Sequence, residues 1–352
     1  MSDATAGADG STEDKYADLL SDEEGVPAFE SVMETRETRR ERYSRKFDTY
    51  VRTPLAIMFE DWRAVVGLLI ISTYVVVGAF GPMVMDPVLM GEGEPLISPF
   101  QNWQFPLGTD RTGQDLLTMT VYSTRPVLLM MGSGAFFTVT VGTIVGTLAG
   151  YKGGALDTVL STVTDTFINI PGLPLVIVLS VIIEPTNPII VGIFLSIALW
   201  AGLARSIRSQ LLTLRRESFV ESSQALGVPT GRLIRKELLP HLLPYVVINF
   251  VNAARIVIFS AVALYFLGVL PFEDSNWGIV MNLAYENGAH YRPDALHWLL
   301  VPVFAIVFLS VGLVLLAQSL DRVFNPRVRA RSSEGGDEDE STTATTAMTG
   351  GR

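Results

Sequence analysis

The chain carries no residue pattern for catalysis or for binding ATP by itself. No Gly-Lys pair occurs in its 352 residues, so the phosphate-binding loop G-x-x-x-x-G-K-[ST] is absent. Its three histidines, His241, His290 and His297, lack the spacing of metal ligands, and the absence of cysteine excludes disulfides and Cys-ligated metals. No G-x-S-x-G nucleophile motif occurs either. The sequence therefore predicts neither an enzyme nor a cofactor held by this chain.

The most informative polar stretch, residues 205–240, contains a short predicted helix. Ser218 followed three residues later by Glu221 is a capping-box pattern, which predicts a helix start. Gly227 favours a helix stop, because glycine tolerates the left-handed conformation found there. The apolar residues of the segment are Phe219, Ala225 and Leu226. We expect a compact helix near 218–227, exposed to the cytosol.

Long uncharged runs predict an all-α, polytopic membrane protein. Hydrophobic residues make up 49% of the chain, and a helix needs about 20 apolar residues to cross a bilayer. Lipid offers no hydrogen-bond partner to free backbone groups, so each span must be helical. Six spans are expected, over residues 64–85, 126–151, 166–183, 185–204, 238–272 and 298–320.

The basic residues predict that both ends of the chain lie in the cytoplasm, because Lys and Arg are retained on that side. In this N-in/C-in orientation, only Arg111, Arg125 and Arg292 of the 26 Lys and Arg residues lie outside, and Arg255 lies within a span. The expected organisation is a cytoplasmic region over 1–62, a transmembrane domain over 63–324 and a cytoplasmic tail over 325–352.

The two ends differ in composition from the transmembrane domain. Residues 1–35 and 331–352 are rich in acidic and small polar residues, which predicts disorder. Residues 35–46 are basic, and they either adhere to anionic lipid or form a solvated helix with internal ion pairs. The strong preference for Arg over Lys, with a net charge of −10, is typical of salt-loving microbes such as halophilic archaea.

From the short helix onward, the sequence resembles the permeases of binding-protein-dependent ABC importers. The signature of that family is E-A-A, three residues, G, nine residues, I-x-L-P. The matching residues here are Glu221, Ser222, Ser223, Gly227, Leu239 and Pro240. The chain departs from the signature at Ser222 and Ser223, which replace alanines but remain small. It also departs at Glu237, which replaces isoleucine, and the peptide-transport branch often has a polar residue there.

Further motifs resemble the C-type subunits of the dipeptide, oligopeptide and nickel transport branch. Residues 106–115 are similar to P-L-G-T-D-x-x-G-R-D, with Gln114 in place of the arginine. Residues 149–154 are similar to A-G-Y-x-G-G, and residues 265–268 with Trp277 and Gly278 to S-F-L-G and W-G. The resemblance covers about residues 50–325.

The resemblance implies the type I ABC importer permease fold and a role for the segment 218–227. This segment would be the coupling helix that docks in a groove of an ATPase subunit, with Phe219, Ala225 and Leu226 as anchors and Glu221 facing polar groups. The implied partners are a B-type permease, two ATP-binding cassette subunits that use ATP and Mg, an extracytoplasmic substrate-binding protein and the lipid membrane, without nucleic acid. The chain would form half of a translocation pathway in the plasma membrane.

Charged residues inside the spans are candidates for the pathway. Asp165 precedes Pro171 by six residues, as in the family's D-x-x-x-x-x-P element, and it either contacts substrate or bonds a neighbouring helix. Arg255 lies mid-span and either lines the pathway or pairs with a partner subunit. Aromatic residues of the outer segments either receive the binding protein or mark the membrane boundary. They are Phe100, Trp103, Phe105, Trp277, Tyr285 and Tyr291.

Alternatives stay open for the solute and for the energy source. Peptides or similar small solutes are expected, and the same importer class carries sugars or nickel complexes in other cases. A secondary transporter is the alternative from another class. It would need a midplane site of broken helices and an ion-coupling carboxylate, often within an inverted repeat, and no convincing repeat is evident in the sequence.

Overall fold

The computed structural model describes residues 59–272 and 275–324, and within these residues the chain is helical, without a β-strand. The predicted all-α class is confirmed. The predictions for residues 1–58 and 325–352, including the disordered ends and the basic segment 35–46, lie outside the described residues. The long helices are α4 (Trp62–Val84), α5 (Leu116–Lys152), α6 (Gly154–Asn169), α9 (Leu199–Leu214), α12 (Leu239–Phe266) and α14 (Leu296–Phe324). The shorter elements are α7 (Gly172–Ile183), α8 (Pro188–Leu195), α10 (Ser218–Ala225), α11 (Thr230–Leu233), η2 (Ile234–Leu238), α13 (Trp277–Glu286) and η3 (Ala289–Tyr291).

Six crossings are present if each bent pair of helices counts as one. Four continuous helical segments are long and apolar enough to span a membrane: Trp62–Val84, Leu116–Lys152, Thr230–Phe266 and Leu296–Val323. The α6–α7 pair is bent by 86° and the α8–α9 pair by 55°, and each pair taken together is long and apolar enough for one crossing. The helix count thus agrees with the sequence, although two of the crossings are broken.

The expected boundaries of the third and fourth spans, 166–183 and 185–204, are wrong. The helix of the third crossing begins twelve residues earlier, at Gly154, and α9 continues to Leu214, so the polar stretch that starts at residue 205 is largely helical. Asp165 lies just before the third apolar run and Arg205 just after the fourth, but both residues are within helices, α6 and α9. A charged side chain ends an apolar run but does not interrupt the backbone hydrogen bonds of a helix, and here the two charges pair with each other.

A proline accounts for the break between α6 and α7, and a serine hydroxyl caps the helix end at the break between α8 and α9. Ile170 adopts an extended conformation before Pro171, as the residue before proline prefers, so α6 ends there and α7 starts in a new direction. Between α8 and α9, the Ser196 hydroxyl donates to the carbonyl of Gly192 at 2.9 Å. This bond satisfies one of the carbonyl groups that a helix end leaves free.

Helix α5 lies against α4, α8, α9 and α12, and its contact with α9 depends on glycine. A Cβ atom at Gly142, Gly146 or Gly150 would lie 2.9, 2.5 or 3.0 Å from a backbone oxygen of α9. These glycines repeat every four residues, the spacing that brings two membrane helices together backbone to backbone. The two helices therefore pack too closely for side chains between them.

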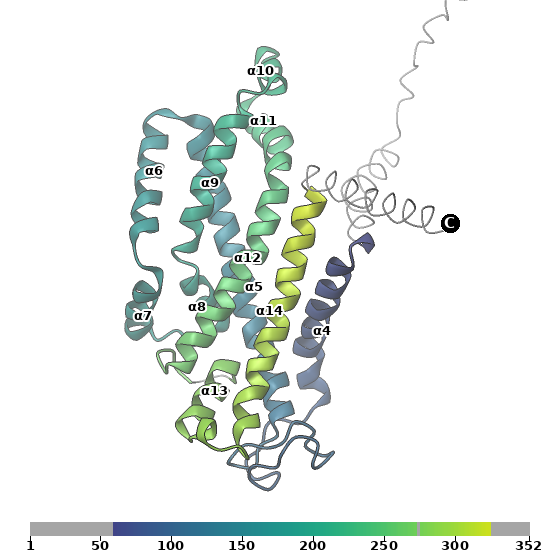
Figure 1. Cartoon of the computed structure of the whole chain (residues 1–352). Helices are drawn as coiled ribbons and strands as arrows, with labels where there is room; N and C mark the ends of the chain where they lie inside the picture. The colour runs from purple at the N-terminus through teal and green to yellow at the C-terminus, as the bar shows by residue number, and fades with distance from the viewer. Residues whose placement is uncertain (1–58, 273–274, 325–352) are drawn as a thin grey trace, which may run out of the picture. The chain divides into compact units, whose positions relative to one another are not determined.

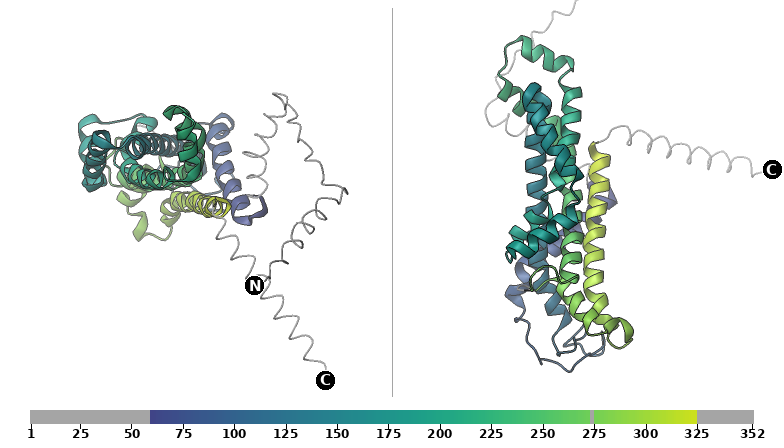
Figure 2. Two further views of the ribbon diagram at one scale, coloured as in Figure 1. Left: turned by 90° about the horizontal axis from the view of Figure 1, so that it is seen from above. Right: turned by 90° about the vertical axis from the view of Figure 1, so that its left-hand side faces the viewer.

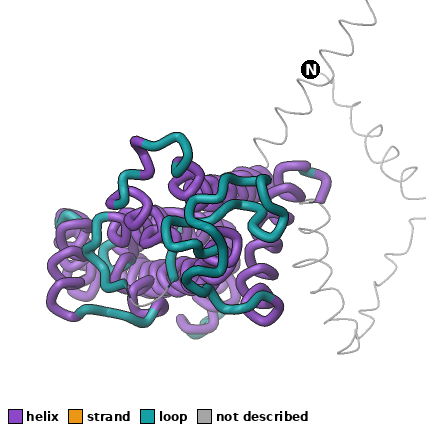
Figure 3. The backbone as a smooth tube through the Cα atoms, turned by 90° about the horizontal axis from the view of Figure 1, so that it is seen from below, coloured by secondary structure: helices purple, strands orange, loops and turns teal. Residues whose placement is uncertain are grey.

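The helices alternate in direction, so the connections gather at two ends (Figure 1). One end carries α10 and the turn between α5 and α6, and Figure 2 shows α10 beyond the ends of α9 and α12. The other end carries α13 and the segment 86–115, whose loops are seen from below in Figure 3. We call these the α10 end and the α13 end.

The P-L-G-T-D motif builds the segment at the α13 end. Asp110 is 3% exposed, and its carboxylate accepts hydrogen bonds from the amides of Thr112 at 2.7 Å and Gln114 at 2.8 Å. Arg111 donates to Asn287 at 2.7 Å, which ties the segment to the end of α13. The motif therefore specifies a local fold rather than a free binding loop.

We expect Gly146→Ala to destabilise the bundle by about 1–3 kcal/mol, because the added methyl group would meet the Ala204 carbonyl at 2.5 Å. Gly132→Ala on the same helix is the matched control, since nothing lies within 4 Å of its added carbon. Thermal unfolding in detergent should show a lower melting temperature for the first variant, and an unchanged or slightly higher one for the second. Equal melting temperatures would contradict the close packing of α5 and α9.

Candidate functional site: an exposed helix and the charges of the bundle

Helix α10 ends as the sequence predicts. Gly227 has a φ of +73°, the left-handed conformation that glycine tolerates. Its amide donates to Gln224 at 2.9 Å, and the amide of Val228 donates to Ser223 at 3.1 Å. These two bonds form a Schellman motif, which satisfies carbonyl groups at the helix end. The prediction of a glycine stop is confirmed.

The predicted capping box at the start of α10 is wrong. The residue before the helix is Glu217, whose side chain makes no capping hydrogen bond, and Ser218 is already helical. The amides of Val220 and Glu221 donate to the Glu217 carbonyl at 3.0 and 3.2 Å. The chain leaves α9 through a tight turn, so the helix starts one residue earlier than a Ser218 cap would allow.

One face of α10 is held against the bundle by three contacts. Val220 is fully buried in a cluster with Ile207 and Leu211 of α9 and with Leu233, Leu238 and Leu242 at the start of the following helical segment. The Ser223 hydroxyl donates to the Glu237 carboxylate at 2.9 Å. The ring of Phe219 stacks on that of His241, with centroids 5.2 Å apart. Helix α10 therefore packs against α9 and against the segment that leads into α12.

The opposite face of α10 and its C-terminal end are open. Leu226 is 83% exposed, and Glu221, Ser222 and Ala225 are exposed as well. Of the three expected anchors, Ala225 and Leu226 are thus free to contact another protein, whereas Phe219 is 37% exposed and already stacked on His241. An apolar side chain with this exposure at a helix end is a feature of helix-in-groove recognition.

The departures from the family signature are explained by a bond between two of them. Ser223 stands where the family has alanine and Glu237 where it has isoleucine, and the serine hydroxyl contacts both carboxylate oxygens, at 3.1 and 2.9 Å. Ser222, the other departure, instead donates to the Ser218 carbonyl of its own helix at 2.8 Å. Two polar residues at signature positions thus contact each other in this chain.

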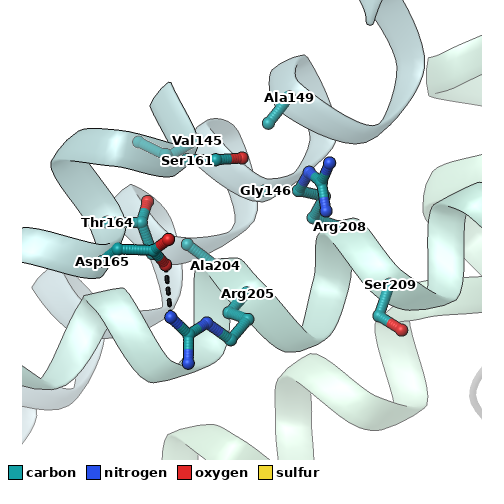
Figure 4. Close-up of a pocket in the computed structure, with 10 residues that line it drawn as sticks. All are labelled: Val145, Gly146, Ala149, Ser161, Thr164, Asp165, Ala204, Arg205, Arg208 and Ser209. Carbon is teal, nitrogen blue, oxygen red and sulfur yellow. Dashed lines mark hydrogen bonds and ion pairs between the residues drawn. The ribbon is translucent and has the colours of Figure 1, made fainter. Parts of the chain in front are cut away.

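Two ion pairs join α6 to α9. Arg208 binds Asp157 with two hydrogen bonds, at 2.5 and 2.7 Å. Arg205 pairs with Asp165, as the dashed line in Figure 4 shows. A cavity of about 310 Å³ lies beside these pairs, between α5, α6 and α9, and is also lined by Ser161, Thr164 and Ser209.

The contact of Asp165 agrees with one of the two alternatives derived from the sequence. It bonds a neighbouring helix of the same chain, so its charge is matched by Arg205. A role in the pathway remains a prediction for this residue. The pair of Asp157 and Arg208 was not foreseen, since the two residues are 51 positions apart and only the packing of α5, α6 and α9 brings them together.

Arg255 differs from the arginines of α9. Its side chain is partly buried on α12, and within residues 59–272 and 275–324 it has neither a hydrogen bond nor an ion pair. The sequence left two interpretations open, a pathway residue or a contact to a partner subunit. Under either interpretation, the hydrogen-bond partner of the Arg255 guanidinium comes from outside the described residues.

The aromatic residues at the α13 end divide into two sets. Trp277 and Phe105 are 0% and 3% exposed, so the expectation of a landing surface is wrong for them. The Trp277 indole donates to the Thr120 carbonyl at 3.2 Å, which locks α13 onto α5. The exposed residues are Phe100, Trp103, Tyr285 and Tyr291.

Nearby, a hydrogen bond from Arg292 lowers the pKa of Asp294 below its usual value.

The sequence did not indicate three residues that hold α10 in place: Val220, Glu237 and His241. A weak signal was present, because Glu237 and His241 are four residues apart and so share one side of a helix. Val220 gave no signal of its own, since its neighbour Phe219 is the larger apolar residue. Sequence alone cannot say which of two adjacent apolar residues points inward.

A bundle of membrane-spanning helices with an exposed helix at one end has the organisation of a membrane transport subunit. Residues 142–330 match the family described as the binding-protein-dependent transport system inner membrane component, and the chain belongs to this family. It is a permease subunit of an ABC importer in the plasma membrane and is not itself the ATPase. Subunits of this family generally work with another permease, ATPases and a substrate-binding protein.

Individual relatives agree with this family. The chain is 29% identical over 302 residues to the dipeptide transport system permease protein of Bacillus subtilis, covering 81% of this chain and 91% of the relative. It is 34% identical over 208 residues to the oligopeptide transport system permease protein of Haemophilus influenzae, covering 58% and 64%. A chain of the MetNI methionine ABC transporter overlaps with a TM-score of 0.41 at 19% identity, covering 58% of this chain and 97% of the other.

We expect Ser223→Ala to loosen α10, because the Glu237 carboxylate loses its hydroxyl donor. A loss of about 1 kcal/mol would speed amide hydrogen exchange in α10 roughly fivefold. Ser222→Ala is the matched control, since that hydroxyl bonds only its own helix and its removal should leave the exchange nearly unchanged. The contact would be disproved if both variants exchanged at the wild-type rate.

Proposed function

We propose that the chain forms half of the pathway by which peptides or similar small solutes are imported. Support comes from the relatives, whose names specify dipeptide and oligopeptide transport, and from the C-type motifs along the chain. The other half would be a B-type permease. Two ATP-binding cassette subunits would use ATP and Mg, an extracytoplasmic binding protein would deliver the solute, and this chain would hold no cofactor.

In this proposal α10 is the coupling helix. The observation that carries it is the 83% exposure of Leu226 on a helix that is otherwise fixed to the bundle by Val220, Ser223 and Phe219. Leu226 and Ala225 would enter the groove of the ATPase, and Glu221 would meet its polar groups. When ATP brings the two ATPases together, the docked helices move with them and the two permeases rock between inward-open and outward-open states.

The N-in/C-in orientation follows if the α10 end faces the cytoplasm. Lys152, Arg215, Arg216 and Arg232 are at that end, whereas Arg111 and Arg292 are at the α13 end. This arrangement supports the orientation, because positive charge is retained in the cytoplasm. A halophilic, archaeal source remains a proposal that rests on composition alone.

Two alternatives can be separated from this function. The first is that the same importer class carries sugars or nickel complexes. The cavity beside the two ion pairs does not discriminate between these solutes and peptides. A secondary transporter would need no exposed coupling helix. The broken α6–α7 and α8–α9 crossings alone would suit it, but the family match and the mounting of α10 favour the importer.

We expect the tagged chain, purified in mild detergent, to carry ATPase subunits with it. Leu226→Glu should abolish this co-purification, because the carboxylate would have to enter an apolar groove, whereas Leu226→Met should retain it. Trp103→Glu is a second control, since it places the same charge at a residue that is 81% exposed at the α13 end. Subunit content is read from stained gels and ATPase activity.

Two results would refute the proposal. One is equal retention of ATPases by Leu226→Glu and the wild-type chain, which would remove α10 from the interface. The other is solute transport by the purified chain in vesicles without ATP, which would identify a self-sufficient carrier.

A further inference from the structure

Arg255 is held inside the membrane by its position on α12. About 16 Å of helix separates it from Phe266 and about 24 Å from Leu239. The helix is about 42 Å long, whereas the hydrocarbon core is about 30 Å thick. The charged residues at 232 and 235–237 keep the segment before Leu239 out of the hydrocarbon core, so a core placed anywhere along α12 contains Arg255.

The face of α12 that carries Arg255 is polar over half its length. Tyr245, Asn249 and Asn252 lie on this face at helical spacing, and all three are only partly buried. Beyond Arg255 the same face becomes apolar, with Ile256 and Phe259 42% and 50% exposed. The opposite face packs into the core through Ala254, Val257, Ile258 and Ala261, which are at most 1% exposed.

Lipid cannot cover this face, because an arginine and two asparagines in hydrocarbon would lose their hydrogen bonds to water. Asn249 bonds the Tyr245 carbonyl at 2.8 Å, but the side chains of Asn252 and Arg255 have no hydrogen bond within the described part of the chain. The arginines of α9 show the contrast, since Arg205 and Arg208 both pair with aspartates of α6. The face is therefore covered by water, solute or another subunit.

We propose that Arg255 binds the carboxylate of the transported solute as it crosses the membrane, with the Asn252 amide one turn away as a second donor. A guanidinium pairs with a carboxylate through two parallel hydrogen bonds, and such a pair is stronger away from bulk water. A peptide with a free C-terminus supplies this group. The inference rests on the proposed function and adds to it a residue that selects for a carboxylate.

The same carboxylate chemistry has a second source, an acidic side chain of the second permease. In that case Arg255 would hold the two subunits together and would not meet the solute. Two measurements distinguish the two sources. If the acid belongs to the second permease, assembly of the two permeases depends on Arg255 and solute preference does not.

The test uses the complex purified through the tagged chain and reconstituted in vesicles with its binding protein. ATP-dependent uptake is compared for a tripeptide with uncharged side chains and a free C-terminus, and for its C-terminal amide. The ratio of the two uptake rates is measured for wild type, Arg255→Gln and Arg255→Lys. Because the binding protein is the same in each preparation, its own preference cancels when variants are compared with wild type.

We expect Arg255→Gln to lower the acid-to-amide ratio by about tenfold or more, the loss of one charge-assisted pair. Arg255→Lys should retain part of the preference, because the positive charge stays but the two parallel hydrogen bonds are lost. Arg125→Gln is the matched control, because this exposed arginine lies nearer the α13 end, outside the polar face of α12, and should leave the ratio unchanged.

Three results would overturn the inference. An unchanged ratio in Arg255→Gln would show that the residue does not meet the solute. Loss of the second permease from the purified Arg255→Gln complex would assign the carboxylate to the partner. A wild-type complex that moves neither peptide would instead disprove the proposed peptide transport, and the inference with it.

Discussion

The backbone of α5 lies directly against that of α9, and the placement of the charged and apolar groups around it depends on this contact. Between membrane helices the hydrophobic effect gives no driving force, so close packing has to supply the attraction. Gly142, Gly146 and Gly150 permit it, because each would place a Cβ atom within about 3 Å of an α9 carbonyl. With the two helices in this register, Ile207 and Leu211 meet the cluster that buries Val220 of α10.

Charge is handled in two ways in the bundle. On α9, Arg205 and Arg208 each have a carboxylate partner on α6, so the α6–α9 region carries matched charges. On α12, Arg255 has no such partner within the described residues and lies on a face lined by asparagine. An unmatched cation is costly in a membrane unless another group meets it. This difference separates arginines that join two helices of the chain from Arg255, for which we propose a partner outside the described residues.

Helix α12 connects the two regions to which we assign function. Its start, with the preceding turn, holds α10 through Glu237 and His241, and its middle carries Arg255. The apolar cluster around Val220 includes residues of α9 and of the segment leading into α12. In the proposed importer, a movement of α10 driven by an ATPase would therefore be transmitted to the helix that contacts the solute. Because α12 is a continuous helix, no flexible segment separates its start from Arg255.

The sequence by itself determined the all-α class, the apolar membrane-spanning character, the short helix near 218–227 and its glycine stop. These depend on local properties: the length of apolar runs, the lack of hydrogen-bond partners in lipid and the freedom of glycine at positive φ. The motifs at residues 106–115, 149–154, 265–268 and 277–278 together also indicated the family branch without reference to any contact.

Only the tertiary structure decided which residues meet. The pairs Asp157–Arg208 and Ser223–Glu237 join residues that are 51 and 14 positions apart, and no local spacing predicts them. The same holds for the inward direction of Val220 and the burial of Trp277. The span boundaries at residues 166 and 204 were misplaced because a charge ends an apolar run in the sequence but does not end a helix, as Asp165, Arg205 and Arg255 all show. Pairing is a property of packed helices, and the sequence of one helix does not contain it.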